Sequence, residues 1–227
     1  MTEVQRTERT TPRTLPSRAS SDLETIRAIV DEALCCHVAT SDGGFPRIAP
    51  MVHGRVGDEL VLHGSHKSTL LAALARGAEA CACFTLIDGL VLGRSALHHS
   101  MNYRSVIVFG RAREVTDFEE KSELLKRLTE RVVPGRWAEL RPMSPQEVHA
   151  TLVVALSLAE SGAKLRTGPP IDAPSDVDGP WWAGEVPLAL CAGAPIPSPD
   201  LPAGIEPGPS VRALALRHAP RERTRAS

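Results

Sequence analysis

Residues 35–64 consist of short apolar runs separated by turn residues, and this spacing constrains the fold more than any other part of the chain. CCHVAT, FPRIAPMVH and ELVLHG favour strands, and SDGG and GRVGD between them contain turn-forming Gly and Asp. Connections this short join antiparallel neighbours. The sequence therefore predicts consecutive β-hairpins.

Elsewhere the apolar residues recur with the period of a helix. These segments are Ile26 to Leu34 after a capping-box pattern at Ser21 and Glu24, Leu70 to Ala75 before Gly77, Leu124 to Val132 after Asp117, and a short segment begun by Ser144, Pro145 and Glu147. The remaining strand-like runs are EACACFTLI, GLVLGRSAL, Tyr103 to Val115, TLVVALSLA and WWAGEVPLALC. Short strands with peripheral helices predict a mainly β fold, built as an antiparallel sheet or barrel.

The chain has 227 residues, of which 42% are hydrophobic and 23% charged, and this suits one globular domain. We expect that domain to span 20–194. Residues 1–19 are polar and are predicted to be flexible. Residues 195–227 are rich in proline and end in a basic segment, so they are predicted to be partly disordered.

Composition also argues against several classes of protein. A formal net charge of −1 gives no overall attraction to nucleic acid or to anionic membranes. The apolar runs are far shorter than the roughly 20 residues of a membrane span, and the N-terminus lacks the apolar centre of a secretory signal. Five cysteines, two of them adjacent, do not suggest a disulfide framework. We therefore expect a cytoplasmic protein.

The segment from His98 to Ser105 concentrates polar and aromatic side chains beside a strand-like run, as a site for a polar ligand would. His98 and His99 do not predict a metal, because adjacent strand residues point to opposite faces and no third ligand has a familiar spacing. No GxSxG, HExxH or Walker motif occurs, so hydrolysis has no support.

Two further segments have both a functional and a structural interpretation. In HGSHKS, Ser65, Lys67 and Ser68 stand where a strand gives way to a helix, which suits a phosphate or simply a serine cap. Pro50 cannot donate to a sheet ladder, so it indicates either an edge strand or a strand that faces a ligand.

The late segments leave the same choice open. Lys164 and Arg166 lie on one face if extended, and they could neutralise an anion or face water. Trp181 and Trp182 could cover a flat ligand or close the end of the barrel as core residues.

Taken in order, HGSHKS, DGLVLGRSALHHSMNYRSVIVFGRA, VPGRW, AKLRTGPP and WAGEVPL make the chain resemble the flavin-nucleotide-binding proteins related to pyridoxamine 5'-phosphate oxidase. The resemblance covers roughly Leu15 to Leu201. It implies an FMN-binding split β-barrel over 20–194 that forms a homodimer with FMN near the subunit interface.

The resemblance also implies the cofactor contacts. Ile48, Ala49, Pro50 and Met51 would line the isoalloxazine, His63 and Gly64 would lie toward the ribityl chain, and Ser65, Lys67 and Ser68 would hold the phosphate. Arg104, Ser105 and Val106 match an Arg-Gln-Val pattern with Ser105 in place of Gln, and Lys164, Arg166 and Trp182 would come from the dimer partner. The family's C-terminal Arg-rich substrate motif has no clear counterpart, so vitamin B6 oxidation is not expected.

The function that follows is an FMN-dependent oxidoreductase acting on a small molecule, because a flavin itself supplies the hydride chemistry. His99 and Tyr103 are the candidate catalytic residues, since both can donate a hydrogen bond or a proton. A non-catalytic flavin-binding or flavin-storage module is one alternative. A haem-binding relative on the same barrel is another, with His63 or His99 as the axial-ligand candidate.

Overall fold

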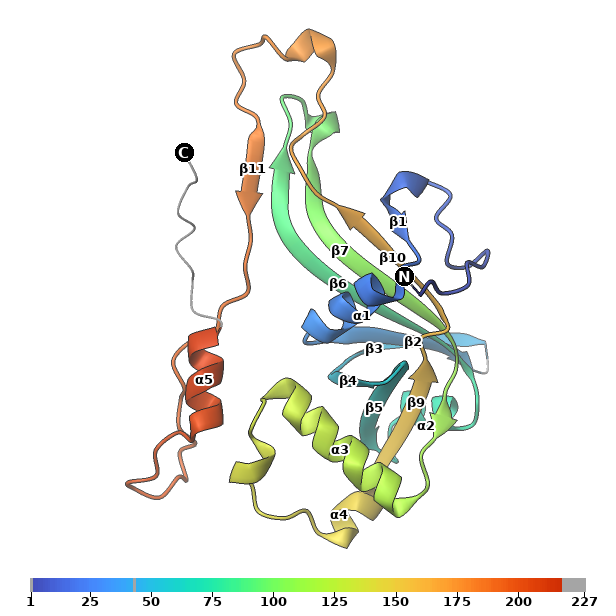
Figure 1. The fold of residues 1–227 in the computed structure, drawn as a ribbon, viewed down its shortest axis with the longest axis vertical. Helices are drawn as coiled ribbons and strands as arrows, with labels where there is room; N and C mark the ends of the chain where they lie inside the picture. Colours follow the sequence, from blue (N-terminus) through green and yellow to red (C-terminus); the bar gives the residue numbers. More distant parts are fainter. Residues whose placement is uncertain (1, 43, 218–227) are drawn as a thin grey trace.

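The computed structural model describes residues 2–42 and 44–217, which form two antiparallel sheets with helices around them (Figure 1). The larger sheet has the order β1 (Ala19–Ser20), β10 (Glu160–Arg166), β7 (Ser100–Arg111), β6 (Glu79–Leu92), β2 (Cys36–Asp42), β3 (Phe45–Met51), and β11 (Gly184–Pro187) also pairs with β6. The smaller sheet has the order β4 (His53–Val56), β5 (Glu59–Ser65), β9 (Thr151–Ser157), β8 (Arg113–Glu114).

The hairpins predicted for residues 35–64 are confirmed, since β2 pairs with β3 and β4 pairs with β5. FPRIAPMVH, however, is not one strand. The chain leaves the larger sheet after Met51, passes through Val52, and enters the smaller sheet at His53. This exchange between sheets lets the apolar faces of both sheets enclose one core.

EACACFTLI and GLVLGRSAL, read from the sequence as two strands, are largely one strand, β6. The pairing with β7 continues past Asp88, with only a shift of register between Ile87 and Gly89. A Cβ at Gly89 would lie 2.9 Å from the carbonyl oxygen of Val186 in β11. Gly89 therefore allows β11 to lie close to β6, as glycines at bulges often do.

The helices are α1 (Leu23–Glu32), α2 (Thr69–Ala75), α3 (Phe118–Val132), α4 (Pro145–Ala150) and α5 (Pro209–Arg217), with short 3-10 turns η1 (Pro16–Arg18), η2 (Ala96–His98), η3 (Trp137–Glu139) and η4 (Pro174–Asp176). The predicted caps at Asp117 and at Ser144 with Glu147 are confirmed. The cap of α1 is Asp22 instead of Ser21, because the Asp22 carboxylate accepts from the Thr25 amide at 3.0 Å. Within the described residues, no helix has the length and apolar character that a bilayer crossing requires.

The apolar residues form two cores. The larger core lies between the sheets and includes Phe84, Leu62 and Leu156 with the apolar faces of α1 and α2. The second core lies between the smaller sheet and α3, where Val61 and Leu128 are buried. Because side chains alternate along β5, that strand contributes to both cores.

Both terminal segments contact the domain. Arg9 pairs with Glu79 and Glu160, and its guanidinium lies 4.9 Å from the centroid of the Phe109 ring. At the other end, the Ser210 amide that opens α5 donates to Glu139 of η3 at 2.8 Å. Flexibility of residues 1–19 and 195–227 stays a prediction, and residues 218–227 lie outside the described part of the chain.

Candidate functional site

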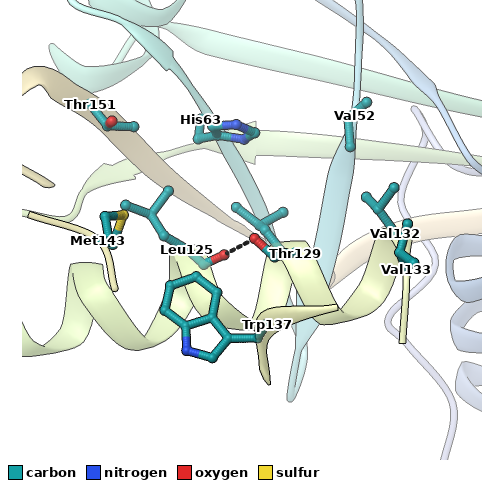
Figure 2. Close-up of a pocket in the computed structure, with 10 residues that line it drawn as sticks. Val52, His63, Leu125, Thr129, Val132, Val133, Trp137, Met143 and Thr151 are labelled. Carbon is teal, nitrogen blue, oxygen red and sulfur yellow. Dashed lines mark hydrogen bonds between the residues drawn. The ribbon is translucent and has the colours of Figure 1, made fainter. Parts of the chain in front are cut away.

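A cavity of about 420 Å³ lies between the smaller sheet and α3 (Figure 2). Its volume falls within the range of roughly 300–1,000 Å³ that is usual for ligand pockets. Most of the side chains around it are apolar, with one histidine and two threonines among them. They are Val52, His63, Leu125, Leu128, Thr129, Val132, Val133, Trp137, Met143 and Thr151.

His63 is the titratable group on this wall. It lies on β5 between Leu62 and Gly64, and strand alternation turns its side chain away from the larger core and toward α3 (Figure 2). Its Nδ1 atom is buried and has no hydrogen-bond partner within the described residues. Burial lowers the pKa of His63 below its ordinary value, so the ring is neutral at pH 7.

The threonines on the wall already use their hydroxyl protons. The Thr129 hydroxyl donates to the Leu125 carbonyl at 3.1 Å, and the Thr151 hydroxyl donates to the Glu147 carbonyl at 2.8 Å (Figure 2 shows the first). A neutral imidazole is a common metal ligand, and the Met143 thioether is a soft one. The lining therefore suits a largely apolar ligand, and the His63 imidazole is a group on this wall that could bind a metal.

The turn between β5 and α2 exposes the predicted phosphate-binding residues. The Lys67 amide donates to the Ser65 hydroxyl oxygen at 3.1 Å, while the Lys67 ammonium has no acceptor in the part of the chain that the structure describes. Ser68 caps α2 by accepting from the Leu71 amide at 3.3 Å. Ser68 thus has a structural role whether or not it also contacts a ligand.

Strand β3, predicted to contact a flavin ring, is an edge strand, as Pro50 allows. The Ile48 side chain is 69% exposed and Pro50 is exposed, whereas Ala49 and Met51 pack against the larger core. The outer edge of β3 therefore offers backbone groups and an apolar face to a ligand or to another chain.

Arg104 is held by two carboxylates on its own chain. Its guanidinium bonds Asp88 at 2.7 and 2.9 Å and also bonds Glu32, and these contacts raise the pKa of Arg104. It borders a cavity of about 680 Å³, which none of the described β3 or β5–α2 turn residues line. Because the two carboxylates neutralise the Arg104 guanidinium, this residue does not give the cavity a net positive charge for an anion.

The other predicted contacts on β7 and β10 are neighbours across that strand pair. The Ser105 hydroxyl donates to the Lys164 carbonyl at 3.1 Å, and Val106 is buried in the larger core. The Lys164 ammonium donates to the Thr14 carbonyl at 3.2 Å.

Arg166 is buried, and its guanidinium bonds Asn102 and the carbonyls of Gly168 and Pro169 at 2.8 and 2.9 Å. Its donors are therefore used within its own chain. Trp182, in the loop before β11, is 67% exposed. The structure thus brings residues 104–106 beside residues 164–166, but it places Trp182 on a separate loop.

The histidine cluster at the β6–β7 connection is held by local contacts. Asp172, whose side chain is only 2% exposed, accepts from the Arg94 guanidinium at 2.7 Å and lies 3.6 Å from His98 Nδ1. His99 is exposed, and its Nδ1 lies 2.9 Å from the Ser95 carbonyl. His98 ends η2 instead of lying on a strand, so the predicted alternation of His98 and His99 across a strand is wrong.

The sequence motifs predicted His63 but not the opposite wall of its cavity. The helical period identified Leu125, Leu128 and Val132 as a packing face, and it gave no sign that part of this face borders a cavity. Trp137 lies in the VPGRW motif that carried the family resemblance. That motif was the one available signal for this wall.

Comparison with solved structures assigns the fold. The flavocytochrome Anf3 of Azotobacter vinelandii is 35% identical over 92% of this chain and 97% of its own, with a TM-score of 0.86. The FAD and heme binding protein of Mycobacterium smegmatis is 41% identical over 87% and 97% of the two chains, with a TM-score of 0.83. These matches confirm the split-barrel fold predicted from the sequence.

The family assignment comes from a second comparison. The model of the pyridoxamine 5'-phosphate oxidase family matches residues 22–164, and the chain belongs to that family. No curated protein matches the sequence.

Proposed function

We propose that this protein binds both a flavin nucleotide and a haem and that it acts as an oxidoreductase on a small molecule. The observation that carries the proposal is the neutral His63 imidazole on the wall of a largely apolar cavity, with an Nδ1 atom that has no hydrogen-bond partner among the described residues. The two relatives above that are at least 35% identical are named as a flavocytochrome and as an FAD and heme binding protein, which supports the same pair of cofactors.

His63 would hold the haem iron in this proposal. Because Nδ1 is buried, Nε2 is the ring nitrogen available to a metal in the cavity. The apolar side chains of Val52, Leu125 and Val132 would contact a porphyrin face and keep water away from it. His99, the other candidate, is exposed and lies outside the residues that line this cavity.

For the flavin, the exposed turn between β5 and α2 is the proposed phosphate site. The exposed Lys67 ammonium would supply a positive charge, and the exposed Ser65 side chain would add a hydroxyl. The edge of β3, with Ile48 and Pro50 exposed, would contact the ring system. A second copy of the chain would complete this site, which makes the proposed active form a homodimer.

When bound, a flavin supplies hydride or electron-pair chemistry and a haem iron supplies one-electron chemistry. His63 lies on a paired strand, which would hold its ring in place beside the cavity. Because the ring is neutral, a ring nitrogen would be able to bind the iron. His99 and Tyr103 remain the proposed donors toward a substrate. FMN follows from the family resemblance, whereas the name of the Mycobacterium smegmatis relative favours FAD.

Absorption spectra of three proteins test the proposal. The wild-type protein, purified from cells supplied with iron and riboflavin, is expected to show flavin bands and a Soret band. His63→Ala should lose the Soret band and keep the flavin, while His99→Ala should keep both. Loss of the Soret band in His99→Ala alone would reassign the ligand, and a wild-type protein without a Soret band would refute haem binding.

Flavin binding has its own test. Lys67→Gln should raise the flavin Kd on the order of tenfold, since a charge-assisted hydrogen bond contributes about 1.5 kcal/mol or more. The Soret band should not change. Chromatography of the released flavin distinguishes FMN from FAD, and turnover of NAD(P)H distinguishes an oxidoreductase from a storage module. Unchanged flavin affinity in Lys67→Gln would move the phosphate site elsewhere.

A further inference from the structure

Among the residues that the structure describes, none accepts a hydrogen bond from Nδ1 of His63, and this is unusual for a histidine that binds a metal. A metal-bound histidine almost always donates its second ring N–H to a carboxylate, a carbonyl or water, and this contact raises the basicity of the ligand. In the described part of the chain, Nδ1 is buried and makes no hydrogen bond.

The surroundings of His63 explain the missing contact. His63 lies on the central part of the β5–β9 pair, opposite Val153, where neighbouring carbonyls take part in the sheet. No Asp or Glu is among the described residues that line the cavity. The Thr129 and Thr151 hydroxyls donate to carbonyls of α3 and α4, and neither hydroxyl oxygen is hydrogen-bonded to Nδ1. Nδ1 is also buried from water.

We propose that His63 binds haem iron through Nε2 as a neutral imidazole whose Nδ1 proton has no acceptor, a proposal that rests on the proposed function. To coordinate through Nε2, the ring must carry its proton on Nδ1. Without an acceptor for that proton, His63 donates less charge to the iron than a hydrogen-bonded histidine does. The ferric state is then less stabilised, so the reduction potential is high and the iron–histidine bond is weak.

The cavity variant His63→Gly provides a direct test, because an added imidazole can replace the missing side chain. Imidazole has an N–H group at the position of Nδ1, whereas 1-methylimidazole has none. The methyl group needs no extra room, since turning the ring about the iron–nitrogen axis puts it where the His63 Cβ was.

His63→Gly, which should hold little haem by itself, is incubated with haemin and titrated with each compound. The ratio of the two affinities is then divided by the same ratio for haem in detergent micelles. The corrected affinities should agree within about twofold, and the two rescued haems should have equal reduction potentials. If an acceptor for Nδ1 existed, imidazole would bind several-fold more tightly, since a hydrogen bond contributes about threefold to tenfold in affinity. A fivefold preference for imidazole, with a lower potential, would overturn the inference.

One control variant and two outcomes separate this inference from the proposed function. His66→Gly removes an exposed histidine whose Nε2 lies 3.2 Å from the His149 carbonyl, and it should keep the wild-type spectrum. A wild-type protein that binds no haem would refute the proposed function. A His63→Gly protein with an unchanged haem spectrum and no added imidazole would show that His63 is not the ligand.

A measurement on the wild-type protein covers the case in which His63→Gly fails to fold. The iron–histidine stretching frequency of the ferrous protein should be close to that of a haem with an imidazole whose N–H is not hydrogen-bonded. A frequency raised to that of an imidazole bonded to a carboxylate would overturn the inference.

Discussion

Replacing His63 with Leu should stabilise the cofactor-free protein, although it should abolish haem binding. A buried polar atom without a partner costs roughly 1–3 kcal/mol, and Leu removes this cost while keeping a side chain of similar size in the apolar cavity. Because the His63 side chain is only partly buried, we expect a gain of about 1 kcal/mol. For a domain of this length, that gain raises Tm by about 2–4 °C.

The measurement is urea unfolding of cofactor-free protein at pH 7.5, where the lowered pKa keeps His63 neutral. His53→Leu is the matched control. His53 is also buried with an unpaired Nδ1, but its Nε2 lies 2.9 Å from the Val30 carbonyl near the end of α1, and its ring packs edge-on against Phe84. His53→Leu should therefore destabilise the protein by about 1 kcal/mol or more.

The two variants should thus change stability in opposite directions. A residue that is kept for function at a cost in stability is expected to behave as His63 does. If His63→Leu lost as much stability as His53→Leu, His63 would be a structural residue and the argument from its unpaired nitrogen would be wrong.

Three further predictions concern other parts of the chain. Burial raises the pKa of the Cys36 thiol to about 12, so at pH 8 iodoacetamide should modify exposed Cys35 and leave Cys36 intact until the protein unfolds; equal rates in mass spectrometry would contradict this. The side-chain hydrogen bond with Arg141 lowers the pKa of Glu147 to about 2, so its contribution to α4 is fully present above about pH 4.5 and is lost as the pH falls toward 2. Hydrogen exchange of residues 145–150 should show this loss, and Glu147→Gln should remove the pH dependence. Ser68→Ala should destabilise the fold by about 1 kcal/mol, because it removes the N-cap of α2. Urea unfolding measures this loss, with Ser65→Ala as the control. If both variants lost the same stability, the Ser68 cap would not be what stabilises α2.

Local sequence signals predicted the elements well where the structure depends on neighbouring residues. The hairpins of residues 35–64 and the caps at Asp117 and Ser144 follow from turn and capping chemistry. The change of sheet at Val52 and the bulge at Gly89 did not follow, because both depend on what packs beside them in the folded chain. Tertiary contacts decided these two positions.

The candidate site was predicted only in part, because it also depends on tertiary contacts. His63 could be named from its motif, and Lys67, predicted as a phosphate contact, is exposed on the turn before α2; its role stays a prediction. The cavity that gives His63 its chemistry exists only when α3 packs on the smaller sheet, and a periodic apolar face does not reveal where that packing is incomplete. The Glu32 and Asp88 partners of Arg104 are likewise far from it in sequence.

The most direct test of the account is to count both cofactors in one purified preparation of the wild-type chain. The haem content, from the alkaline pyridine spectrum, and the flavin content, from the supernatant after denaturation, should each approach one per chain. His63→Ala should retain the flavin and contain almost no haem. A wild-type protein that holds flavin but no haem, even after incubation with haemin, would contradict the assignment of the His63 cavity.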